Sequence, residues 1–142
     1  MKIAIDIADA IVTELQAAVF SEPLIIARQV LPEFELAQLK QVTVTVVPKS
    51  VQIANITRQS SSFDVAVDIG IQQKIDKDTN AEVQRLSGIV TELVSYLNKK
   101  QLASFPAAQF KSIANEMVYS PEFLREKRVF LSVVTVIYSV QE

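Results

Sequence analysis

Four aspartates between residues 64 and 78 are the densest group of side chains that could take part in catalysis or metal binding. They are Asp64, Asp68, Asp76 and Asp78. Carboxylates act as acid–base pairs or metal ligands only when their oxygens converge, and two residues four apart on a strand lie about 13 Å from each other. The segment 76–80 begins like a calcium loop but lacks the later glycine and glutamate. A solvent-exposed strand face is therefore the simpler interpretation of Asp64 and Asp68.

The residue types that most enzymes use are missing. The chain contains no histidine and no cysteine, which removes the commonest general base and the commonest metal ligands. A serine nucleophile in the run 60–62 would need a lysine partner, and no strained elbow or oxyanion loop accompanies it. The only glycines, Gly70 and Gly88, cannot form a glycine-rich phosphate loop. We therefore expect neither catalysis nor a cofactor or metal.

Length and charge limit the remaining classes. A chain of 142 residues fits a single domain over residues 1–142. A net charge of −2 disfavours specific nucleic-acid binding, which gains its energy from neutralised phosphates. No apolar run approaches the roughly 18–20 residues that span a bilayer, so we also expect no membrane partner.

Hydrophobic periodicity predicts an α+β fold. Helices are expected over residues 3–19 and 79–100, and strands over 24–30, 41–47, 63–71, 110–119 and 128–140. The order α-β-β-β-α-β-β indicates one antiparallel or mixed sheet with two helices packed on one face. Residues 48–62 are mostly polar. They are expected to form a long connection that protrudes as an arm and extends the two neighbouring strands. Gly88, within the second helix, is expected to mark a close approach to the sheet.

The last strand is apolar on both of its faces. One face carries Val129, Leu131, Val133 and Ile137, and the other carries Phe130, Val134, Val136, Tyr138 and Val140. A single layer of helices covers only one of them. Either the chain folds back over both faces, or another subunit covers the second one.

Exposed basic residues admit two interpretations each. Arg58, in the polar arm, is either a solvated loop charge or a contact to an acidic partner. Arg125 and Arg128 lie beside glutamates in a charged turn, so they form either a surface ion network of small energetic value or pairs between subunits.

Several short segments follow one another in a familiar order along nearly the whole chain. They are the N-terminal helix, Leu31-Pro32-Glu33-Phe34, the strand that ends at Pro48, Arg58, the alternating strand through Asp64 and Asp68, the long helix, Tyr119-Ser120-Pro121-Glu122, and Arg128-Val129-Phe130. This layout resembles the small neck and tail-completion proteins of long-tailed bacteriophages and prophages, particularly the tail terminators.

This resemblance implies a structural virion protein without catalytic residues. Tail terminators form a ring, typically a hexamer, on the head-proximal end of the tail tube, where it stops polymerisation of the major tail protein and provides the surface for the head-completion or connector protein. Assembly would take place in the bacterial cytoplasm, and the protein would reside at the tail–neck junction of the virion. By position, the expected subunit or tube contacts are Arg58, Arg125, Arg128, Phe130, Val134, Val136 and Tyr138.

Two rival functions remain open at this point. One is another neck component, such as a head-completion or stopper protein. The other is a cellular adaptor domain that dimerises through its terminal strand and binds peptides by strand addition.

Overall fold

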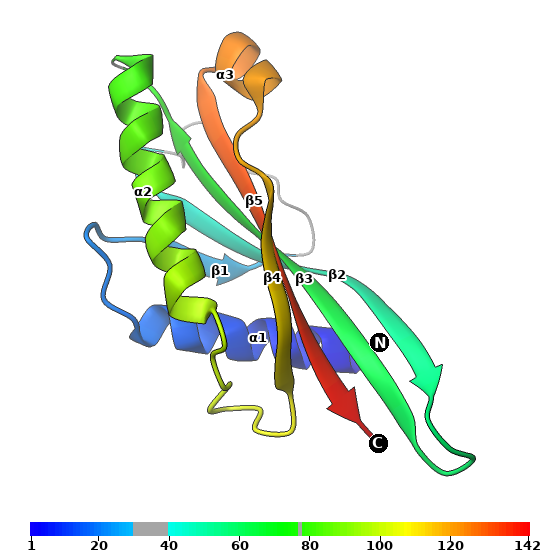
Figure 1. Cartoon of the computed structure of the whole chain (residues 1–142). Helices are drawn as coiled ribbons and strands as arrows, with labels where there is room; N and C mark the ends of the chain where they lie inside the picture. Colours follow the sequence, from blue (N-terminus) through cyan, green and yellow to red (C-terminus); the bar gives the residue numbers. More distant parts are fainter. Residues whose placement is uncertain (30–39, 77) are drawn as a thin grey trace.

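A five-stranded mixed sheet forms the centre of the computed structural model, which describes residues 1–29, 40–76 and 78–142 (Figure 1). The elements, in chain order, are α1 (Lys2–Ala17), β1 (Ile25–Arg28), β2 (Thr43–Asn55), β3 (Ser61–Lys74), α2 (Thr79–Leu97), β4 (Gln109–Met117), α3 (Pro121–Lys127) and β5 (Val129–Gln141). The strand order is β1-β2-β3-β5-β4, in which β1 runs parallel to β2 and the other neighbours are antiparallel. The expected α+β class is confirmed.

Both long helices lie on the same face of the sheet. Directly paired residues share a face, and Ile69 of β3 pairs with Val46 of β2 and with Val134 of β5. These three residues belong to one continuous hydrophobic core with Ile7 and Ile11 of α1 and with Leu86 and Leu93 of α2. The sheet twists strongly between the two helices, so that α1 crosses one end and α2 the other (Figure 1).

The local sequence explains how α2 begins. The side chain of Asp78 accepts hydrogen bonds from the backbone N–H groups of Asn80 at 3.0 Å and Ala81 at 3.4 Å. Glu82 places a negative charge in the first turn, where the helix dipole favours it. Gly88 lies in the exposed middle of this helix and would meet nothing within 4 Å if it carried a Cβ. The expected close approach at Gly88 is therefore wrong.

The charged turn before the last strand is a short helix, so the element order differs from the predicted one. Ser120 caps α3 by accepting a hydrogen bond from Phe123 N at 3.3 Å, and Pro121 occupies the first turn. The helix ends at Arg128, whose φ of 54° turns the chain into β5. The expected segments from Val30 through Leu39 lie outside the described residues, and so does the Leu31–Phe34 part of the resemblance.

Edge strand β4 is less regular than its sequence suggested. Regular alternation over the expected strand 110–119 would place Ile113, Met117 and Tyr119 on one side. Two register shifts interrupt the pairing with β5, so Ile113 lies opposite Val136 of the helix-covered face, whereas Met117 lies opposite Val133 of the other face. A bulge adds one residue on one strand and reverses the alternation beyond it. Two bulges also make this edge a poor template for further strand pairing.

The expected arm is present as a β-hairpin. We call residues 48–64 the arm: they comprise the outer part of β2, the turn 56–60 and the start of β3. It is the long hairpin that extends past both chain termini in Figure 1. β1 accompanies β2 only as far as Val46. Within the described chain, no strand lies beside the outer edge of the arm.

Candidate interaction surfaces

The side chains expected on β5 to contact other subunits are buried inside the single chain. Phe130, Val134, Val136 and Tyr138 are each 0% exposed and belong to the core under the helices. The expectation that these four residues make subunit or tube contacts is therefore wrong. Both faces of this strand have similar apolar content, and the sequence does not say which one the helices cover.

Tyr138 shows how completely this face is enclosed. Its hydroxyl donates a hydrogen bond to the backbone oxygen of Lys100 at 2.9 Å, and the ring of Phe110 packs edge-on with centroids 5.8 Å apart. Burial, with a smaller contribution from the charge of Glu14, raises the pKa of Tyr138 to about 12. The phenol is therefore a fixed part of the core.

The opposite face of β5 retains solvent-accessible apolar side chains. Leu131, Val133 and Ile137 are half-buried, and they do not belong to the core that includes α1 and α2. A polar contact interrupts this face, where Thr135 donates to Asp68 at 2.6 Å and Lys49 lies 3.8 Å from the same carboxylate. If another subunit covers part of β5, this is the face that is available.

The arm presents apolar and basic side chains on a defined turn. Ile53 is 56% exposed and Ile56 is 52% exposed. The hydroxyl of Thr57 accepts hydrogen bonds from Gln59 N at 3.2 Å and Ser60 N at 3.1 Å, which fixes the turn. Arg58 is exposed there and makes no ion pair or hydrogen bond within the described residues.

The sheet holds the inner strand of the arm in place. Ser61 and Glu142 exchange backbone hydrogen bonds of 2.6 and 2.9 Å. Lys111 of β4 forms an ion pair with Asp64 across β5. The Lys111 hydrogen bond, helped by Ser139, lowers the pKa of Asp64. The outer strand and the turn remain free to contact a partner.

A shallow groove lies at the corner of the sheet farthest from the arm. It has a volume of about 310 Å³ and lies between α2 and β4. Its lining residues are Ser87, Val90, Thr91, Val94, Ser95, Asn115 and Val118. Val118 and the adjacent Tyr119 are 57% and 42% exposed. An apolar hollow with exposed apolar residues at its rim is typical of a contact surface.

Asn115 gives this groove a fixed wall. Its side-chain amide donates to Met117 O at 3.1 Å, to Ser132 Oγ at 3.1 Å and to Val133 O at 2.9 Å. These bonds stabilise the second register shift of β4. The next residue, Glu116, is exposed and has no ion pair or hydrogen bond within the part of the chain that the structure describes.

The four aspartates considered as chemical groups all have structural partners. Asp64 pairs with Lys111, Asp68 accepts from Thr135, and Asp78 caps α2. Asp76 lies 3.9 Å from Lys74. Among residues 1–29, 40–76 and 78–142, no three acidic, histidine or cysteine side chains cluster as metal ligands would.

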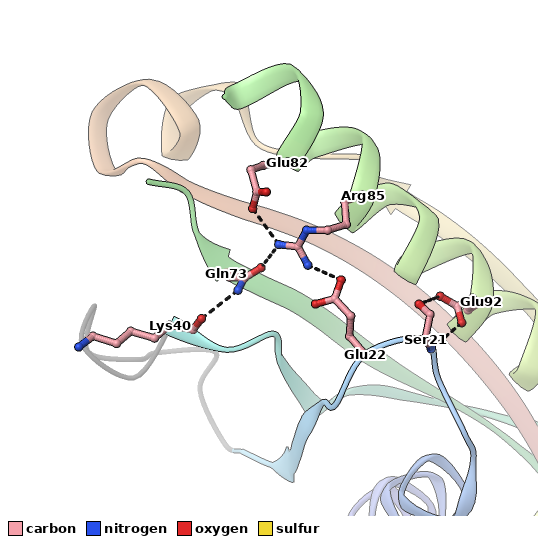
Figure 2. Close-up of polar contacts among 7 residues, drawn as sticks. All are labelled: Ser21, Glu22, Lys40, Gln73, Glu82, Arg85 and Glu92. Carbon is pink, nitrogen blue, oxygen red and sulfur yellow. Dashed lines mark hydrogen bonds and ion pairs between the residues drawn. The ribbon is translucent and has the colours of Figure 1, made fainter. Parts of the chain in front are cut away.

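A separate polar cluster joins α2 to the segment before β1 (Figure 2). Arg85 forms ion pairs with Glu22 and Glu82 and donates to Gln73 at 2.5 Å. The hydrogen bond with Glu82, together with Glu22, raises the pKa of Arg85. The guanidinium is therefore fully engaged within the chain. This cluster positions α2 and does not offer an unpaired charge to a ligand.

The same picture shows how the cluster extends in both directions. Gln73 of β3 donates to the backbone oxygen of Lys40 at 2.9 Å, and Glu92 accepts from the backbone and hydroxyl of Ser21 at 3.0 and 2.6 Å (Figure 2). Two turns of α2 thus hold the segment around residues 21–22 in place. Sequence reasoning missed this cluster, because the pairs that join α2 to residues 21–22 are 63 and 71 residues apart, and only Glu82–Arg85 is a local pair.

The two other predicted arginines occupy different environments. Arg125 is exposed on α3. Arg128 donates to Thr79 at 2.9 Å, and its backbone oxygen accepts from Ile75 at 2.8 Å. Arg128 therefore joins the end of α3 to the start of α2, which gives it a role within the chain.

Comparisons with known proteins do not assign this chain to a family. The sequence matches no family model and no curated protein. No described helix has both the length and the apolar character needed to cross a membrane.

Proposed function

We propose that this chain is a structural protein that assembles with copies of itself into a ring, in the manner of a phage tail terminator. In this proposal the ring, expected to be a hexamer, sits on the head-proximal end of a tail tube. It stops addition of the major tail protein and presents the surface for a head-completion or connector protein. The chain carries out no catalysis and needs no cofactor.

The arm is the observation that carries this proposal. The base of the arm contacts the core through Val51, but its outer part, where Ile53 and Ile56 are more than half exposed, does not. Burial of a large apolar side chain is worth roughly 1.5–3 kcal/mol, which a monomer forgoes and an assembly recovers. Extended elements that reach a neighbour are also what the resemblance to tail terminators implies.

The difference between the two candidate surfaces supports a ring over a compact pair. The arm is a convex hairpin, whereas the groove between α2 and β4 is concave, and they lie at opposite edges of the sheet. Contacts between two unlike surfaces of the same chain are heterologous, and they produce a closed ring when the rotation per subunit closes.

Native mass spectrometry over a concentration series tests the assembly. A closed ring supports the proposal, and a hexamer agrees best with it. A stable two-fold dimer with no larger species would favour the strand-addition adaptor instead. A monomer at every concentration, even in the presence of tail tubes, would contradict self-assembly.

A second experiment tests the place of the ring in the virion. Purified protein is mixed with headless tails and, separately, with tailless heads, and binding is followed by sedimentation and electron microscopy. Capping of the tail tube at one end supports the terminator function. Binding to heads alone would identify another neck component.

Reversal of the charge at Arg58 tests the role of the arm. We expect Arg58→Glu to weaken assembly without changing the melting temperature of the monomer, because the exposed side chain makes no hydrogen bond or ion pair within the described chain. Lys99→Glu is a matched control at another exposed position. If Arg58→Glu lowers monomer stability by the same proportion as assembly, Arg58 has a structural role only.

A further inference from the structure

Six of the eight exposed large apolar residues of the described chain lie at two opposite corners of the molecule, and Val19 and Ile25 lie elsewhere. Met1 and Ile5 lie at the base of the arm, beside Pro48 to Val51, and Ile53 and Ile56 lie on the arm. Val118 and Tyr119 lie at the far end of β4, at the rim of the groove. Figure 1 shows these corners at opposite ends and opposite edges of the sheet, with the arm below and α3 above.

The groove has room for a side chain of the kind that the arm offers. Its floor and walls combine Val90, Val94 and Val118 with the small polar residues of α2. A hollow of about 310 Å³ accepts a branched aliphatic side chain such as Ile56. The groove carries no charged lining residue, so an apolar group enters it without desolvating an ion.

Charge is complementary beside the apolar contact. Arg58 follows Ile56 by two residues on the turn, and it is an exposed cation without an ion pair in the described chain. Glu116 lies between the groove residue Asn115 and Met117 at the bulge. It is an exposed carboxylate that likewise has no ion pair within the described chain. Opposite charges at the rim of an apolar contact favour one register and one partner.

The arm cannot fill the groove of its own chain, because β3 and β5 lie between β2 and β4 and the two features lie at opposite ends of the sheet. Strand addition at β4 is also disfavoured, since two register shifts disrupt that edge. A side-chain insertion remains as the contact that both surfaces suit.

We propose that the arm of one copy inserts Ile56 into the α2–β4 groove of a neighbouring copy, with Arg58 placed against Glu116 of that neighbour. Repetition of this contact gives each copy one donated arm and one filled groove. This inference rests on the proposed ring and names its interface.

The absence of native cysteine makes the contact directly testable by oxidative cross-linking. The double variant Ile56→Cys/Val118→Cys places one thiol on the arm and one on the groove rim, both at sites more than half exposed. We expect oxidation to give a covalent ladder of dimers, trimers and larger species on a denaturing, non-reducing gel. Peptide mass spectrometry should identify the link between positions 56 and 118.

A matched control uses a thiol away from both surfaces. Val19 is 97% exposed, and the double variant Ile56→Cys/Val19→Cys should give no ladder linked through position 19. Equal cross-linking of the two double variants would show random collision and would overturn the proposal.

Charge exchange supplies a second readout. We expect Arg58→Glu and Glu116→Arg each to raise the concentration needed for assembly by about tenfold, and the double variant to recover most of the loss. Failure of the double variant to recover would contradict the pairing of these two residues.

The outcomes separate this interface from the proposed function. A ring in native mass spectrometry without a 56–118 link would overturn the interface and leave the ring intact. A 56–118 link confined to dimers would support the arm-to-groove contact and contradict the ring, because two arms would then be exchanged reciprocally.

Discussion

The helix-covered face of the sheet and the opposite face come from the same strands, yet their side chains are packed to different degrees. On β5, Phe130, Val134 and Val136 are fully buried, whereas their neighbours Leu131, Val133 and Ile137 are half-buried. The chemical character of the two sets is alike. The difference arises from α1 and α2, which both pack on one side.

The apolar content of a strand face therefore does not by itself identify an interface between subunits. The covered face contributes to the stability of the single chain, because its atoms are removed from water on folding. The half-buried side chains of the opposite face, such as Leu131 and Ile137, and the exposed tip of the arm contribute less to that stability, and their remaining surface is available to partners. Substitutions on the two faces should therefore affect two different measurements, the free energy of unfolding and the extent of assembly.

The largest expected effect comes from Phe130→Ala. This side chain is 0% exposed, and its truncation should lower the free energy of unfolding by about 3–5 kcal/mol. Leu131→Ala, one residue along on the other face, should lower it by only about 1 kcal/mol. Urea unfolding at concentrations where the chain is monomeric measures both. Equal losses would show that the second face is also closely packed within the monomer.

The next effect is a loss of stability at alkaline pH that originates from the covered face. Tyr138 has a pKa of about 12 when folded, against about 10 in an unfolded chain. Because the folded pKa is the higher one, the contribution is complete below pH 10 and is lost as the pH rises towards 12, by up to about 2.7 kcal/mol.

The matched control for that titration is Tyr138→Phe, which keeps the ring and removes the ionisable group. Urea unfolding between pH 9 and 12 should show a smaller decline for this variant than for the original chain. An identical decline in both proteins would mean that other groups, such as the lysines, account for the alkaline loss.

Local pattern was sufficient to find most elements of the fold. The alternation over residues 63–71 predicted a strand with one apolar face, made of Phe63, Val65, Val67, Ile69 and Ile71. The last four are fully buried, and Phe63, on the arm, is half-buried. Asp78 and Thr79 were both candidates for the cap of α2, and Asp78 is the cap. These features depend on neighbours within a few residues, which a single sequence displays directly.

Features that depend on distant residues were not predictable in the same way. The choice of covered face depends on where α1 and α2 pack, so the contacts assigned to Phe130, Val134, Val136 and Tyr138 were placed on the wrong side. The groove depends on two bulges in β4, which reverse the alternation of Ile113 and Met117. The arm was predicted because its polar residues lie between two strongly patterned strands. Arg58 lies within it as expected, and the structure places this residue on the turn.

A smaller effect is expected from Gly70→Ala, on the face opposite the helices. A Cβ at this position would lie 2.9 Å from the hydroxyl oxygen of Thr45, and Thr45 is 0% exposed. Crowding of this kind costs about 1–3 kcal/mol, which thermal or urea unfolding would measure.

The double variant Thr45→Ala/Gly70→Ala isolates the cause, because it removes the crowded hydroxyl. In a Thr45→Ala background, the Gly70 substitution should cost little or nothing. A full loss in both backgrounds would place the strain elsewhere and would show that this part of the second face is not closely packed.

The smallest effect should have the opposite sign and lies on the solvent side of α2. Gly88 is exposed, and a Cβ there would meet nothing within 4 Å. Gly88→Ala should therefore raise the free energy of unfolding by about 1 kcal/mol through helix propensity alone, without a change in assembly. If urea unfolding instead shows no gain while native mass spectrometry shows weaker assembly, a neighbouring subunit must approach α2 closely at this glycine. The interaction surface would then extend from the groove onto the outer side of the helix, where no folding requirement of the single chain explains a glycine.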